Sequence, residues 1–184
     1  MDSYSKYLKY KQKYLNLLGG AAAVGNISLI DYRKDLLDTL NKIDPNSGFV
    51  SASPKIVQRQ ELGCFTIFKI IMLNDNPIGM ITSKWKNKQD MNIEGYDTIF
   101  MIQNITIDHK YQGKGYGSIA LTKFIELSQA KYNLKEIYIS SRSISALKLY
   151  GRLGFKFIKG HNLEPFDELP NENKYEAIMV KLLY

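Results

Sequence analysis

Apolar positions along the chain follow two spacings, one typical of strands and one typical of helices. Residues 64–73, 78–85 and 99–107 are apolar or alternating over strand length and predict buried strands. The first two are separated by Asn74-Asp75-Asn76-Pro77, which predicts a hairpin turn. Beyond residue 117, Leu121, Phe124 and Ile125 recur at helical spacing, so a helix is expected to begin at about Ser118.

Shorter segments complete the predicted order of elements. We expect strands at 136–141, 155–159 and 175–183, and a helix over 143–153 that ends at Gly154. An earlier helix carries Leu36, Leu37, Leu40 and Ile43 and is ended by Asp44-Pro45. Residues 86–96 and 161–174 are predicted to be polar loops. The succession predicts one α/β domain over residues 27–184, a mixed sheet with helices on both faces.

Residues 1–26 form a separate segment in the sequence. Lysine and tyrosine alternate with leucine at a helical period up to Gly19-Gly20, and an alanine-rich linker follows. The pattern resembles an N-terminal segment of giant-virus proteins, which suggests a viral origin and assigns no activity. We interpret this basic amphipathic arm as a solvated helix or frayed end, while a docking or membrane-surface helix stays open.

Composition narrows the class of protein. The chain has 184 residues, which is enough for one domain with a full core, and a formal net charge of +7. No RNA-binding signature or zinc-finger spacing accompanies this charge, so we expect a phosphorylated cofactor rather than nucleic acid. No apolar run is long enough to span a bilayer and no secretory signal is evident. The single cysteine, Cys64, cannot form an internal disulfide, which fits a reducing compartment and a cytoplasmic location, the host cytoplasm if the chain is viral. It lies in an apolar run, which favours a buried thiol.

The stretch from Ile105 to Gly117 carries the first chemical signal. Gly113, Gly115 and Gly117 follow the end of a strand and precede a helix. Glycines let a ligand approach the backbone, and the free N–H groups of a helix start favour a phosphate. The spacing is neither a nucleoside-triphosphate P-loop nor a dinucleotide fingerprint. We interpret the turn as a pyrophosphate cradle, the alternative being a tight strand-to-helix turn.

Two motifs in this order resemble the GNAT family of N-acetyltransferases. Gln112-Gly113-Lys114-Gly115-Tyr116-Gly117 matches its Gln/Arg-x-x-Gly-x-Gly/Ala signature. Residues 146–155, Ala-Leu-Lys-Leu-Tyr-Gly-Arg-Leu-Gly-Phe, match its Ala-x-x-Leu-Tyr-x-x-x-Gly-Phe helix. The resemblance implies a mostly antiparallel sheet that splays beside its central strand, and acetyl-CoA as the cofactor in that slot.

The resemblance also implies a set of site residues. Backbone groups of Ile105 and Ile107 would bind the pantetheine arm, and the Ile107 N–H would polarise the thioester carbonyl. Tyr150 would act as the general acid for the leaving thiolate. Ser143 stands where the family usually has asparagine, and it could cap its helix and still touch cofactor. The remaining cofactor-binding candidates are in the turn itself: Gln112, Gly113, Lys114, Gly115, Tyr116, Gly117 and Ser118.

The sequence does not identify the general base or the acceptor amine. Relatives often keep carboxylates on the central strand or its neighbour, where this chain has Gln103, Asn104 and Ser140. A water relay held by one of these residues, Gln103, Asn104 or Ser140, is one route, with Asn104 as a catalytic candidate. His109 is interpreted as a surface turn residue, and His161, in an acidic loop, stays open. No metal site is expected.

Three kinds of acceptor remain for an enzyme. Residues 31–43 and the Lys-Tyr-Gln-Gly-Lys-Gly block resemble the glucosamine 6-phosphate N-acetyltransferase branch, which makes an amino sugar phosphate one candidate. The acidic loop at 164–172 would suit a polyamine or a peptide amine. A different class, a non-catalytic module that keeps the fold and binds CoA, is the alternative to an enzyme. The expected partner is therefore a small-molecule amine, and a homodimer stays open.

Overall fold

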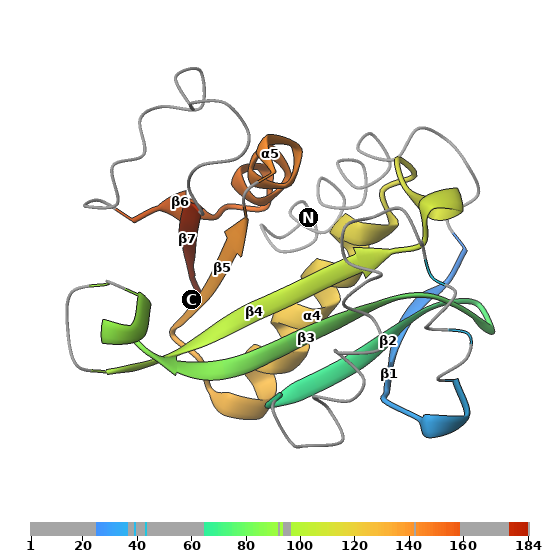
Figure 1. The fold of residues 1–184 in the computed structure, drawn as a ribbon, viewed down its shortest axis with the longest axis horizontal. Helices are drawn as coiled ribbons and strands as arrows, with labels where there is room; N and C mark the ends of the chain where they lie inside the picture. Colours follow the sequence, from blue (N-terminus) through green and yellow to red (C-terminus); the bar gives the residue numbers. More distant parts are fainter. Residues whose placement is uncertain are drawn as a thin grey trace, which may run out of the picture.

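In the described part of this computed structural model, a seven-stranded mixed sheet carries the fold (Figure 1). Its strands lie in the order β1 (Ile27–Asp31), β2 (Ile67–Leu73), β3 (Asn76–Asn87), β4 (Thr98–Ile107), β5 (Glu136–Ser141), β7 (Ala177–Leu182) and β6 (Lys156–Phe157). All neighbouring strands are antiparallel except β4 and β5, which run parallel. The structure describes residues 25–36, 39, 43, 65–91, 93, 97–141, 143–158 and 177–183. The predicted α/β domain with a mostly antiparallel, mixed sheet is confirmed. Residues 1–24 of the N-terminal arm, residues 55–60, Cys64 and the 161–174 loop lie outside the described residues.

The first half of the sheet is a meander of antiparallel strands. β2 (Ile67–Leu73) and β3 (Asn76–Asn87) form the expected hairpin around a two-residue turn at Asn74 and Asp75. Asn74 has φ 53°, a left-handed conformation that asparagine tolerates. β1 (Ile27–Asp31), which the sequence did not predict, pairs with β2 at the edge of the sheet. Of the predicted helix over residues 36–43, the structure describes the short 3-10 helix η1 (Lys34–Leu36) and two further residues.

The second half contains the parallel crossover. β4 (Thr98–Ile107) leads through the 3-10 helix η3 (His109–Tyr111) into α4 (Tyr116–Tyr132), which begins two residues before the predicted Ser118. β5 (Glu136–Ser141) and α5 (Ile144–Arg152) follow at their predicted places. β7 (Ala177–Leu182) pairs with β5 and with the short β6 (Lys156–Phe157). The predicted polar loop at 86–96 begins later than expected, since β3 runs to Asn87, and it contains the 3-10 helix η2 (Gln89–Met91).

Both faces of the sheet are covered by apolar side chains. Alternate side chains of β4 pack into two different apolar clusters. Phe100 and Ile102 belong to the first cluster, and Ile99 and Met101 belong to the second. The described helices α4 and α5 both pack into the first cluster, and α4 lies across one face of the sheet (Figure 1). A third cluster, on the face away from α4, joins Ile43 to side chains of β2 and β3. Most of the helix predicted over residues 36–43, the one that carries Ile43, lies outside the described residues.

Packing fixes the position of α4. Its side chains Ala120, Leu121 and Phe124 are fully buried against the sheet. Burial of a large apolar side chain such as Leu121 or Phe124 contributes about 1.5–3 kcal/mol. Lys123 Nζ also donates to Ile27 O at 2.6 Å, which ties the helix to the edge strand β1. The N-terminus of α4 is therefore held in place beside the end of β4.

Candidate functional site

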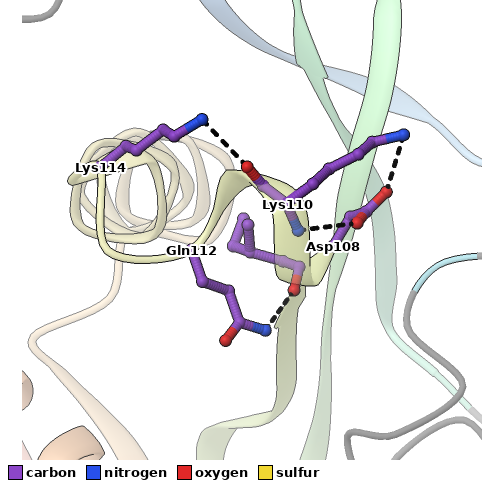
Figure 2. Close-up of polar contacts among 5 residues, drawn as sticks. Asp108, Lys110, Gln112 and Lys114 are labelled. Atoms are coloured by element: carbon purple, nitrogen blue, oxygen red, sulfur yellow. Dashed lines mark hydrogen bonds and ion pairs between the residues drawn. The ribbon is translucent and has the colours of Figure 1, made fainter.

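The turn between β4 and α4 is ordered by its own polar groups (Figure 2). Asp108 caps η3, because its Oδ1 accepts a hydrogen bond from Lys110 N at 3.1 Å. Gln112 follows as the C-cap residue, and its backbone N–H donates to His109 O. Gly113 and Gly115 then take φ 73° and 83°, the left-handed region that glycine adopts without a steric penalty. These residues and the start of α4 are called the glycine turn, residues 112–117.

The N-terminus of α4 offers donors for an anion. Gly115 is the N-cap residue and supplies no side chain, and the first helical bond runs from Ile119 N to Gly115 O. The N–H groups of Tyr116, Gly117 and Ser118 therefore lack intrahelical partners, and the helix dipole adds positive potential there. A Cβ built on Gly113 would meet no atom within 4 Å, so the space beside this residue of the turn is open. An open turn with uncapped donors fits a diphosphate.

Lysines add positive charge around the glycine turn. Lys110 Nζ lies 3.3 Å from Asp108 Oδ2, and Lys114 Nζ donates to Lys110 O at 3.0 Å. Both ammonium groups also lie over the Tyr111 ring, at 5.2 and 5.7 Å from its centroid. His109 is exposed in η3, so its interpretation as a surface turn residue is confirmed. His161 lies outside the described residues.

Beside the turn, the sheet opens between β4 and β5. Within the described parts of these strands, their pairing consists of Met101 with Tyr138 and Ile102 with Ile139. β4 continues for five more residues, to Ile107, still paired with β3. The expected splay of the sheet is therefore present, and the region beyond Ile102 and Ile139 is called the split.

The last residues of β4 direct main-chain groups toward the split. Asp108 N donates to Ile78 O at 2.8 Å, which makes these two residues a hydrogen-bonded pair. Hydrogen-bonded and non-hydrogen-bonded pairs alternate along an antiparallel ladder. Ile107, opposite Gly79, and Ile105, opposite Ile81, therefore use none of their backbone groups toward β3. Their N–H groups point to the edge of β4 that faces the split, where an extended ligand could pair with them.

A bulge in β4 determines the positions of the polar residues beside the split. The register passes from Ile102 opposite Ser83 to Asn104 opposite Thr82, so Gln103 is the extra residue. Asn104 Nδ2 donates to Thr82 Oγ1 at 3.1 Å, and Thr82 is fully buried. Gln103 and Asn104 are both partly exposed. Ser140 lies on β5 opposite Ile178 of β7 and is partly exposed as well.

Tyr150 lies on α5 and belongs to the apolar cluster against which the side chains of Ile105 and Ile107 also pack. The tyrosine is 5% exposed, and its ring centroid is 6.1 Å from that of Phe155. Burial raises the pKa of the Tyr150 phenol to about 12, so the group holds its proton at neutral pH. Among the described residues its hydroxyl has no hydrogen-bond partner, which leaves it available to a ligand.

Ser143 begins the helix that carries Tyr150. Its Oγ accepts from Ala146 N at 3.4 Å, so the predicted N-cap is present. The same oxygen lies 2.8 Å from Ser145 Oγ. Both serines are exposed, so the cap also presents hydroxyl groups at the surface.

The structure thus arranges the predicted residues in two groups. The face of the sheet that α4 covers carries one group, which consists of Ile105, Ile107, Tyr150 and the glycine turn. The bulge turns the side chain of Asn104 to the other face. The sequence reasoning missed Thr82, the buried partner of Asn104. The available signal was the pair Thr82-Ser83, two hydroxyl residues inside an otherwise apolar strand.

Two kinds of feature are absent from the described residues. No group of three or more His, Cys, Asp or Glu side chains gathers there as a metal site requires. No helix in that part of the chain is both long and apolar enough to cross a membrane.

Comparison with known proteins gives one family. The model of the acetyltransferase (GNAT) family matches residues 33–155. A spermine/spermidine N(1)-acetyltransferase of Bacillus subtilis is 43% identical over 53 residues, which cover 28% of this chain and 35% of that protein. The match therefore spans about a third of the length of the curated relative.

Solved structures share the fold. A GNAT family acetyltransferase from Staphylococcus aureus superposes with a TM-score of 0.59 at 19% identity, covering 86% of this chain and 100% of that one. A GNAT family acetyltransferase from Elizabethkingia anophelis, solved with acetyl-CoA bound, gives a TM-score of 0.54 at 21% identity, covering 86% and 99%. At these identities the likeness concerns the fold alone.

Proposed function

The chain belongs to the acetyltransferase (GNAT) family, and from that premise we propose that it is an N-acetyltransferase that uses acetyl-CoA to acetylate a primary amine. One observation carries the proposal. The split between β4 and β5 opens beside the uncapped N-terminus of α4, with the N–H groups of Ile105 and Ile107 directed into it. Donors suited to a diphosphate and donors suited to an extended arm therefore both follow from the same end of β4, which supports an extended phosphorylated cofactor.

Acetyl-CoA, when bound, supplies an acetyl group that its thioester activates toward attack by an amine. The N–H groups of Tyr116, Gly117 and Ser118 would hold the diphosphate, with Lys114 beside them. Gln112, Gly113 and Gly115 shape the turn, and Ser143 would add a hydroxyl at the start of α5. Main-chain groups of Ile105 would hold the extended arm as a neighbouring strand does.

Two groups are assigned to the chemistry. The N–H of Ile107 would donate to the oxygen on which negative charge develops, the role of an oxyanion donor. The phenol of Tyr150, which like any tyrosine is protonated at neutral pH, would hold a proton for the departing sulfur. Direct transfer in a ternary complex needs no further nucleophile on the protein.

Proton removal from the amine is assigned to water. The described residues of the bulge, Gln103 and Asn104, and Ser140 of β5 are neutral at pH 7. They would orient the amine and an ordered water, which takes the proton toward solvent. The Asn104 amide is held by Thr82, so its carbonyl oxygen is left to accept a hydrogen bond from the amine.

Among acceptors we place a polyamine first. The curated relatives are named as spermine/spermidine and spermine acetyltransferases, although they match 53 residues of this chain. An amino sugar phosphate such as glucosamine 6-phosphate and a peptide amine are the other candidates.

Release of free thiol from acetyl-CoA tests the proposal directly. The panel contains spermine, spermidine, glucosamine 6-phosphate and a lysine peptide, and mass spectrometry identifies the acetylated product. Amine-dependent thiol release supports the enzyme, and the fastest amine names the acceptor class. CoA binding in calorimetry without turnover of any amine would instead identify a non-catalytic CoA-binding module. Absence of both binding and turnover would refute the proposal.

A further inference from the structure

The Gln112 side chain folds back from the glycine turn onto the end of β4 (Figure 2). Its Nε2 donates to Ile107 O at 2.8 Å, although the two residues are five positions apart. The backbone N–H of Gln112 is itself fixed, because it donates to His109 O at 3.1 Å. The side chain therefore links an anchored turn to the last carbonyl of the strand.

The peptide group that follows Ile107 is held at both of its edges, by this bond and by a second one. The peptide that joins Ile107 to Asp108 receives Gln112 Nε2 at its oxygen. Its N–H, on Asp108, donates to Ile78 O at 2.8 Å in the neighbouring strand β3. β5 is not paired with β4 at this position, so Gln112 takes the place that a strand neighbour would have.

Gly79 determines where the preceding peptide group lies. A Cβ built on Gly79 would lie 2.2 Å from Thr106 O and 3.2 Å from Ile107 Cα. A residue larger than glycine would therefore displace the peptide that joins Thr106 to Ile107. That same peptide carries the Ile107 N–H on its opposite edge, toward the split.

We infer that Gln112 is a positioning residue, which together with Gly79 fixes the Ile107 N–H at the split. The expected effect on kcat rests on the proposed function. The expected effect on the position of the Ile107 peptides does not. A donor for developing charge acts only at hydrogen-bond distance from the oxygen it stabilises. Rotation of the Ile107 peptides would move that donor while the diphosphate donors of α4 stayed in place.

The alternative role for Gln112 is direct contact with the cofactor. The two roles predict different losses. A direct contact contributes to affinity, so its removal would weaken CoA binding. A positioning contact contributes to the chemical step, so its removal would lower kcat and leave CoA affinity close to that of the wild type.

Gln112→Glu tests the inference, because glutamate has nearly the same shape but offers no N–H and places a carboxylate against the Ile107 carbonyl. Gln112→Arg keeps a donor at this position. Gln89→Glu is the matched control, since it makes the same change at an exposed residue of η2. Gln112 is exposed, so its variants are expected to fold.

The first readout uses the protein without ligand. NMR hydrogen exchange should show faster exchange of the Asp108 amide in Gln112→Glu, and a rate close to the wild type in Gln112→Arg and Gln89→Glu. The second readout is kinetic. We expect kcat to fall about 10-fold in Gln112→Glu, less than the ~10²–10³-fold that follows removal of an oxyanion donor. The calorimetric Kd for CoA is compared in Gln112→Met, which removes the donor without placing a negative charge beside the diphosphate, and it should stay within about a factor of two of the wild-type value.

The inference is overturned if Asp108 exchanges at the wild-type rate in Gln112→Glu, or if the only loss is in CoA affinity. Failure of the proposed function would appear elsewhere, as a wild-type protein that releases no thiol with any amine. In that case the exchange measurement still decides whether Gln112 holds the end of β4.

Discussion

Ile102 and Ile139 are the last residues at which β4 and β5 pair. Beyond them each strand keeps its other neighbour: β4 stays with β3 to Ile107, and β5 stays with β7 to Ser141. The split is therefore bounded by two separately paired parts of the sheet, and neither bounding strand depends on the other for its shape. A ligand that enters can pair with β4 without first displacing a strand.

Tyr150→Phe should lower kcat by about 10²-fold, the lower end of the range for a general acid. The phenyl ring keeps the packing against Phe155, so the calorimetric Kd for CoA should be nearly unchanged. Tyr111→Phe, which removes the same atom from η3, just before the glycine turn, is the matched control and should keep the wild-type rate. A Tyr150→Phe protein with full turnover would remove Tyr150 from the chemistry.

The stability of the protein should depend on pH in the alkaline range through Tyr150. Burial raises its pKa from 10.0 to about 12. Below pH 10 the phenol is protonated in both the folded and the unfolded chain, so the free energy of unfolding does not change. Between pH 10 and pH 12 the unfolded chain ionises first, and stability is lost as the pH rises.

Urea unfolding at pH 8 to 11.5 would measure this loss against Tyr150→Phe. Tyr138 also has a raised pKa, owing to burial and to Glu136. The pH dependence of the wild type alone would therefore contain contributions from both tyrosines. The difference between wild type and variant isolates Tyr150. Parallel curves for the two proteins would contradict a buried phenol at this position.

Local patterns predicted most of the sheet. β2, β3 and β4 are long apolar or alternating runs, and α4 and α5 have buried positions at helical spacing, so each was expected near its observed place. β1 was missed because it is short and lies at the edge of the sheet. Its stability as a strand comes from pairing with β2, where Leu29 lies opposite Ile71. These residues are far apart in the chain, so no local pattern predicts their contact.

The local conformation of the glycine turn and of the start of α5 was predictable, because these are motif positions with a fixed local geometry. Gly113 and Gly115 do adopt positive φ, and Ser143 does cap α5. The bond from Gln112 to Ile107 and the bond from Asn104 to Thr82 were not predictable. The first depends on the path of the turn, and the second on the register of β3 against β4, which a bulge shifts by one residue.

Gly115→Val should abolish CoA binding, because it places a branched side chain in the glycine turn at φ 83°. The backbone strain alone is expected to cost roughly 1–2 kcal/mol of stability. Gly154→Val is the matched control, since Gly154 has φ 90° at the end of α5, away from the turn. Calorimetry should show lost affinity in the first variant and retained affinity in the second. Equal affinities would mean that the turn does not contact the cofactor.

Ser143→Ala should destabilise the protein by about 0.5–1 kcal/mol through loss of the N-cap of α5. The bond from Ala146 N is 3.4 Å long, which favours the lower part of the range for caps. Ser145→Ala is the control, because it removes a hydroxyl beside the cap and leaves the cap itself. Urea unfolding of both variants measures the difference, and Ser143→Asp should restore stability. A Ser143→Ala protein as stable as Ser145→Ala would show that the cap contributes nothing.

Asn104→Asp should change the pH dependence of the reaction. An alkyl amine has a pKa of about 10, so with water as the proton acceptor kcat/KM should rise with pH through the neutral range. A carboxylate at residue 104 would attract the ammonium group and could take its proton, and the Thr82 hydroxyl can donate to it in place of accepting from the amide. The ratio of kcat/KM at pH 7 to that at pH 9 should therefore increase. Asn87→Asp, the same change at the exposed end of β3, should leave the profile unaltered. Identical profiles for Asn104→Asp and the wild type would place the acceptor amine away from the bulge of β4.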